Sequence, residues 1–189
     1  MSIPAILHRV QAKGHEVFSG VDSINIVLER SRGNIPNAFD DLAHAVMRTR
    51  HAGWLHRIWP ITTDPGAYWL RHPMHVEGTA ILAPGQYRGA YQEGLHRGRP
   101  ALVQVGPVDV FRDRDQDGNP DAFGPRYSGL FGVNIHNASR NRPSMLVEKW
   151  SAGCVVFSSD TDHQEFLRLV RVSTHQYGPR VTVTLIQDD

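Results

Sequence analysis

Short β-branched segments separated by turns run through most of this chain, and they constrain its fold more than any other feature. The clearest is RVTVTLI at 180–186, where polar and apolar residues alternate with the period of two that is typical of a half-buried strand. The same reasoning predicts strands at 23–29, 53–61, 78–83, 101–105, 108–113, 130–136 and 154–158.

Helical spacing of apolar residues is confined to three segments, at 4–13, 37–50 and 159–175. The last is the strongest, because Ser159 and Asp162 form a variant of a capping box. These helices do not alternate regularly with the strands, which favours an α+β fold over a doubly wound sheet. We therefore expect a β-rich α+β domain with a few peripheral helices.

Length and charge exclude several classes of protein. The 189 residues suffice for one domain, or for one domain with a small N-terminal appendage. With 20 basic and 19 acidic residues, the chain lacks the basic excess of a nucleic-acid binder. No apolar run approaches the roughly 20 residues that span a bilayer, so we expect no membrane insertion. The N-terminus lacks the pattern of a signal peptide, which predicts synthesis in the cytoplasm.

Cys154 is the only cysteine, so the chain forms no internal disulfide and no multi-cysteine metal site. The thiol is then either an inert buried group or a nucleophile. His136 ends one predicted strand and Cys154 begins another, so neighbouring strands would bring base and thiol together. Gly153 permits a turn before the cysteine, and the N–H groups of Gly153 and Cys154 could then hold an oxyanion. Ser151 could hydrogen-bond in this turn or orient the histidine.

These residues resemble the catalytic signature of the L,D-transpeptidase (YkuD-like) family. That signature is a histidine, about 14 to 17 residues, and then Ser/Thr-His-Gly-Cys. Here 14 residues, 137–150, separate His136 from the motif Ser-Ala-Gly-Cys. The resemblance covers roughly residues 60–170, in a divergent phage or bacterial branch. It implies a YkuD-like catalytic domain at 56–189, with residues 1–55 as an N-terminal helix/strand extension packed on the core.

The resemblance also implies catalytic roles for Cys154, His136, Ser151 and Gly153. Ala152 stands where the family usually has histidine, and Val156 stands where many members have an arginine thought to hold a substrate carboxylate. Arg140, Arg142 or Arg88 would have to supply the missing charge. As residues that contact substrate, we expect Trp150, His96, Tyr87 and Arg88.

The loop DRDQDGNPD at 113–121 suggests a cation site. It places Asp113, Asp115, Asp117 and Asp121 around a glycine turn, as calcium loops do, but Gly124 stands where an EF-hand has glutamate. We therefore consider two alternatives, a structural Ca²⁺ and a polar turn. The reaction implied by the resemblance requires no cofactor.

Eleven histidines also raise the alternative of a zinc peptidase, although the chain lacks a His-Glu-x-x-His motif. Catalytic zinc needs three protein ligands and an open position. Asp64, His96, His136 and Cys154 could supply such a set.

The function expected from the sequence is a cysteine-dependent enzyme acting on peptidoglycan stem peptides. Cys154 attacks a stem-peptide carbonyl and forms a thioester, which water (L,D-peptidase) or an amine (transpeptidase) then releases. The alternative is an inactive module of the same fold that binds peptidoglycan or a partner protein. Without a signal peptide, we expect it to reach the wall through phage lysis, injection or specialised secretion.

Overall fold

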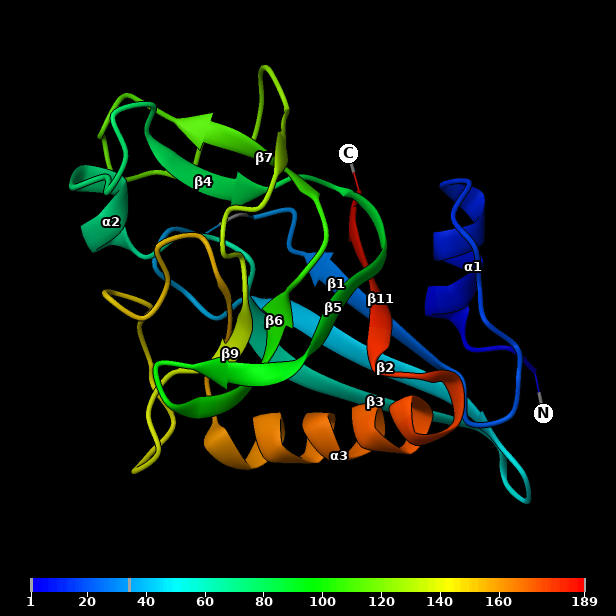
Figure 1. Ribbon diagram of the computed structural model, residues 1–189. Helices are drawn as coiled ribbons and strands as arrows, with labels where there is room; N and C mark the ends of the chain where they lie inside the picture. Colours follow the sequence, from blue (N-terminus) through cyan, green and yellow to red (C-terminus); the bar gives the residue numbers. More distant parts are fainter. Residues whose placement is uncertain (1, 34, 189) are drawn as a thin grey trace.

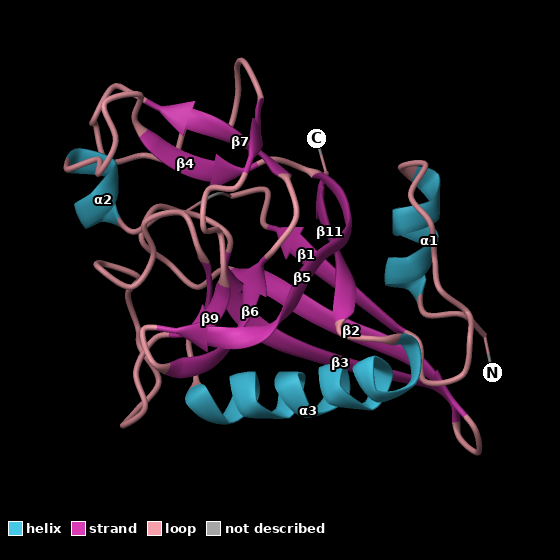
Figure 2. Ribbon diagram, viewed as in Figure 1, coloured by secondary structure: helices cyan, strands magenta, loops and turns pink. Residues whose placement is uncertain are grey.

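The computed structural model describes residues 2–33 and 35–188. In chain order its elements are α1 (Ala5–Ala12), β1 (Ile24–Arg30), β2 (Asp41–Thr49), β3 (Gly53–Thr62), α2 (Ala67–Arg71), β4 (Thr79–Leu82), β5 (Gly85–His96), β6 (Arg99–Gln104), β7 (Val108–Asp113), β8 (Tyr127–Gly129), β9 (Ile135–Asn137), β10 (Val155–Phe157), α3 (Asp160–Tyr177) and β11 (Arg180–Gln187). Figure 2 shows that strands dominate, which confirms the β-rich α+β class. No helix in the described ranges has the length and apolar character needed to cross a membrane.

Most strands form a closed barrel in the order β1-β11-β5-β6-β9-β10-β3-β2. Two of its pairings, β1 with β11 and β9 with β10, are parallel, and the others are antiparallel. A second sheet, in the order β4-β7-β8, lies above the barrel in Figure 1. The two strands of residues 1–55 belong to the barrel, and the boundary expected after residue 55 falls inside β3.

The barrel is filled by apolar side chains and covered by two helices. On α3, Phe166, Leu167 and Val170 are fully buried in the same core as the barrel interior. The ring of Phe166 lies 5.9 Å from that of Trp59 and 5.1 Å from that of Phe157, measured between centroids. On the other side, α1 forms a second apolar cluster with the outer faces of β1, β2 and β11.

This double covering explains why the helix predicted at 37–50 is wrong. The segment contains β2, whose Ala43, Ala45 and Met47 face the main core, while Val46 faces the cluster under α1. A strand buried on both faces loses the polar–apolar alternation that identifies strands in a sequence. Its apolar residues then happened to fit a helical period.

Strand β5 was not predicted, and the strand predicted at 130–136 forms only at its end, as β9. The preceding residues are held instead by Gln104, whose Oε1 accepts from the backbone N–H groups of Phe131 and Val133. A side chain thus replaces the hydrogen bonds of a sheet and leaves an irregular segment beside β6.

The N-terminus of α3 provides a test of the packing. Ser159 Oγ accepts from the N–H of Asp162, as the capping pattern predicts. Ser159→Ala should therefore lower the free energy of unfolding by about 1 kcal/mol, measured by urea denaturation. Ser159→Asp is the matched control, since it keeps an acceptor at the cap. Equal losses in both variants would contradict a capping role.

Candidate active site

The parallel pairing of β9 with β10 places His136 next to the cysteine segment. Val155 N–H donates to the carbonyl oxygen of Asn134 at 2.9 Å, and His136 is paired with Val156. Cys154 directly precedes β10 and is partly exposed. The strand arrangement expected from the sequence is therefore present.

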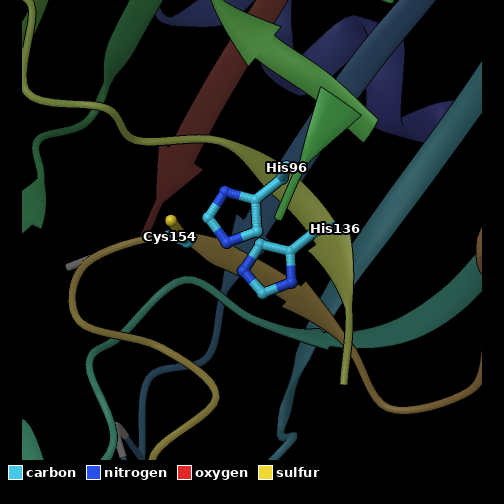
Figure 3. Close-up of side chains that lie close together, drawn as sticks. All are labelled: His96, His136 and Cys154. Carbon is cyan, nitrogen blue, oxygen red and sulfur yellow. The ribbon is translucent and has the colours of Figure 1, made fainter. Parts of the chain in front are cut away.

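Three side chains converge at this point. One ring nitrogen each of His96 and His136 and the sulfur of Cys154 all lie within 4.8 Å of one another. The two imidazoles are stacked, with centroids 4.3 Å apart and planes 13° apart. Figure 3 shows the rings lying against each other with the sulfur beside them. His96 reaches the site from the end of β5, far from His136 in the sequence.

The turn before Cys154 is built by Ser151. Its Oγ donates to the carbonyl oxygen of Cys154 at 2.7 Å and accepts from the N–H of Gly153 at 3.2 Å. Of the two roles considered for Ser151, the structure contains the hydrogen bonding within the turn. The N–H of Gly153 is thereby engaged, so it does not face the pocket as an oxyanion donor.

Gly153 is required at its position for a steric reason. Its φ of +120° favours glycine, and a Cβ there would lie 2.5 Å from the carbonyl oxygen of Ala80. The turn therefore packs directly against β4, and the smaller sheet helps to fix the position of Cys154.

The thiol and its neighbour are both neutral at rest. Burial raises the pKa of the Cys154 thiol, and burial lowers the pKa of His136 to about 4. The Sγ donates to the carbonyl oxygen of Gly132 at 3.4 Å. His136 Nε2 is buried and has no hydrogen-bond partner among the described residues. A neutral imidazole with an open Nε2 can accept a proton when the thiol turns toward it.

A pocket of about 590 Å³ opens over the thiol and both imidazoles. Its apolar wall includes Trp69, Leu130, Phe131, Trp150 and Ala152. A second pocket, of about 220 Å³, adjoins the histidines and shares Trp150 with the first. Trp150, which the sequence analysis names as a substrate contact, thus forms part of the wall of the cleft.

The larger pocket is basic. Arg97, Arg112 and Lys149 line it, while no aspartate or glutamate within residues 2–33 and 35–188 does. None of the three forms an ion pair with another described residue. Burial lowers the pKa of Arg112 despite the attraction of Glu77, and its guanidinium lies over the ring of Phe131. A cleft with such a surplus of positive charge favours an anionic ligand.

Two residues expected to contact substrate lie elsewhere. Tyr87 is buried and donates its hydroxyl hydrogen to the carbonyl oxygen of Ala83, while Arg88 pairs with Glu16. Neither lines the cleft, and neither do Arg140 and Arg142. The basic residues that do line it come from three different loops or strands, and no local sequence pattern connects them.

The acidic loop follows β7. The carboxylate of Asp113 accepts from the N–H of Asp121, and that of Asp115 accepts from the N–H of Asp117. Among the described residues, the group of three side chains close enough to share a metal ion is His96, His136 and Cys154, not this loop. The calcium site therefore stays a prediction. Asp64 of the zinc hypothesis is paired with buried Arg30 instead.

Comparison of the chain with protein-family models, with curated proteins and with solved structures gives no match.

Two buried histidines should make the fold sensitive to acid. Burial lowers the pKa of both His136 and His163 from 6.5 to about 4. Between about pH 6.5 and pH 4, these two histidines bind protons in the unfolded chain but not in the folded chain. The free energy of unfolding should therefore fall as the pH falls through this range. Urea unfolding at about pH 7.5 and about pH 5 measures the loss of unfolding free energy between the two conditions. His136→Gln should make this loss smaller, because one of the two buried histidines is removed. An unchanged midpoint between the two conditions would contradict it.

Proposed function

We propose that this protein is a cysteine-dependent enzyme of the L,D-transpeptidase (YkuD-like) type that acts on peptidoglycan stem peptides. The observation that carries the proposal is the open Nε2 of His136 beside the Cys154 thiol, at the floor of a basic pocket. The order and spacing of His136, Ser151, Gly153 and Cys154 in the sequence support the same assignment.

The chemistry runs in two halves. Cys154 Sγ attacks the carbonyl carbon of the acyl donor while its proton passes to His136 Nε2. The C–N bond then breaks, and His136 returns the proton to the leaving amine. This leaves a thioester on Cys154. Water or an amine then attacks the thioester carbon while His136 Nε2 accepts its proton, the C–S bond breaks, and His136 returns the proton to the Cys154 thiolate. Attack by water completes hydrolysis, and attack by an amine completes transpeptidation.

The charge of the pocket supports a substrate of this class. Stem peptides carry free carboxylates, and Arg97 and Arg112 line the same pocket as the thiol without forming an ion pair to a described residue. They would take the place of the family arginine that is replaced here by Val156. We assign the carboxylate-binding role to these two residues in place of Arg88, Arg140 and Arg142.

The alternative is a binding module of the same fold, and one observation favours it. The thiol rests on the carbonyl oxygen of Gly132 rather than on His136, and burial raises its pKa. Such a thiol would be inert if it never turned toward the imidazole. The basic cleft would then bind an acidic peptide without cleaving it.

Mixed muropeptides read by mass spectrometry separate the two functions. The wild-type protein should remove a terminal residue, open a cross-link or exchange an amine, and Cys154→Ala should do none of these. His136→Gln should lower the rate by roughly 10²–10⁴-fold, the usual contribution of a general base. Glu165→Gln on α3, outside both pockets, is the control. Activity retained by Cys154→Ala would refute the proposal, and stoichiometric binding without turnover by wild type would establish the alternative.

The role of Arg112 is testable with the same substrate. Arg112→Gln should raise KM roughly 10–150-fold with little change in kcat, because a charge-assisted hydrogen bond to a carboxylate contributes about 1.5–3 kcal/mol. Arg114→Gln is the matched control, since Arg114 pairs with Glu77 outside the pocket. A substrate with its carboxylate amidated should abolish the difference between wild type and Arg112→Gln. A persisting difference would argue against carboxylate binding.

A further inference from the structure

His96 has a defined place in the cleft that the reaction above leaves unexplained. It is the last residue of β5, held by a tight hairpin in which Arg97 and Gly98 have φ values of +49° and +75°. Its ring is stacked on His136 and lines both pockets. Position and stacking alone do not say whether the ring offers a proton or a lone pair, but its hydrogen bonds do.

The partner of His136 fixes one proton. His136 Nδ1 lies 2.9 Å from the carbonyl oxygen of Asn137, which can only accept. Nδ1 therefore carries the hydrogen, and Nε2 of the neutral ring holds a lone pair. This is the tautomer that a general base for Cys154 requires.

The partner of His96 fixes the opposite arrangement. Asn134 Oδ1 accepts from the backbone N–H of Gln104 at 2.9 Å, which determines the orientation of the amide. The Nδ2 of Asn134, which can only donate, then lies 3.0 Å from His96 Nδ1. His96 Nδ1 must accept, so the hydrogen of the neutral ring is on Nε2.

The two stacked rings therefore have complementary roles. Nε2 of His136 accepts, and Nε2 of His96 donates. Of the two backbone donors expected from the sequence, the N–H of Gly153 is already bound to Ser151 Oγ. Only the N–H of Cys154 is left for a developing oxyanion, so a second donor is needed here. Ala152 lines the same pocket, and its methyl side chain offers no donor.

We propose that His96 is a catalytic hydrogen-bond donor: its Nε2–H stabilises the oxyanion that forms when Cys154 attacks, and the Gln104–Asn134 pair sets its tautomer. This role rests on the proposed acyl-transfer function. It also opposes a zinc ion on His96, His136 and Cys154: Asn134 Nδ2 occupies His96 Nδ1, so such an ion would need a lone pair on His96 Nε2.

The tautomers are measurable without any substrate. In the full chain labelled with ¹⁵N-histidine, two-dimensional NMR above about pH 8, well above the ordinary histidine pKa, should find His96 protonated on Nε2 and His136 on Nδ1. Asn134→Asp is the matched variant: its carboxylate only accepts, so the proton of His96 should move to Nδ1. Protonation of His96 on Nδ1 in the wild type, or an Nε2 signal that disappears on adding Zn²⁺, would overturn the proposal.

The catalytic role is read from two reactions of the same thiol. Acylation of Cys154 by a small activated ester, followed by intact mass, passes through an oxyanion, whereas alkylation by iodoacetamide does not. His96→Phe keeps a stacked ring but lacks the donor, so acylation should slow by roughly 10²–10³-fold while alkylation changes little. His96→Gln, which retains an N–H donor, should recover part of the acylation rate, and Asn134→Asp should slow acylation despite retaining the imidazole.

Failure of this role is distinguishable from failure of the proposed function. If His96→Phe slows acylation and alkylation equally, His96 is structural, and the inference is wrong while the enzyme stands. If the wild type is alkylated but never acylated, the proposed function fails and the donor role fails with it, although the NMR result still decides the tautomers.

Discussion

The parallel pairing of β9 with β10 is the constraint on which the rest of the site depends. Parallel neighbours cannot be joined by a tight turn, so the chain must leave the barrel between Asn137 and Val155 and return. The long connection is held at Val147, whose N–H donates to the carbonyl oxygen of Asn37. It then supplies Lys149, Trp150 and the Ser151 turn. One pairing thus aligns the base with the thiol and also provides a wall of the pocket.

The remaining walls come from hydrogen bonds made by side chains rather than by strands. Gln104 holds the irregular segment that carries Phe131 and accepts the thiol hydrogen at Gly132. The backbone N–H of the same residue orients Asn134, which in turn contacts His96. The side chain and the main chain of Gln104 therefore position different parts of one site. These hydrogen bonds of Gln104 explain why the cleft forms beside β6. No residue of β6 itself lines the larger pocket.

The sequence predicted those parts of the molecule whose signal is local. The alternation in β11, the cap at Ser159 and the spacing of His136 from Cys154 each depend on residues close together in the chain. β2 was misread because α1 and the barrel core bury its opposite faces, and a sequence does not show what covers a strand. Arg97 and Arg112 were missed for a related reason: each is an ordinary surface-type residue until the fold brings them to the same pocket. His96 was named as a contact residue, but its proton could be placed only from Asn134 and Gln104.

The close approach of Gly153 to the carbonyl oxygen of Ala80 connects the turn before the nucleophile to the smaller sheet. Because the turn before Cys154 packs directly on β4, local fluctuations of the smaller sheet should change the space around the Cys154 sulfur. Proteins open such units locally at a cost below that of global unfolding. The rates at which Cys154 reacts with thiol reagents of increasing size would therefore report these fluctuations. No label on the smaller sheet itself would be needed.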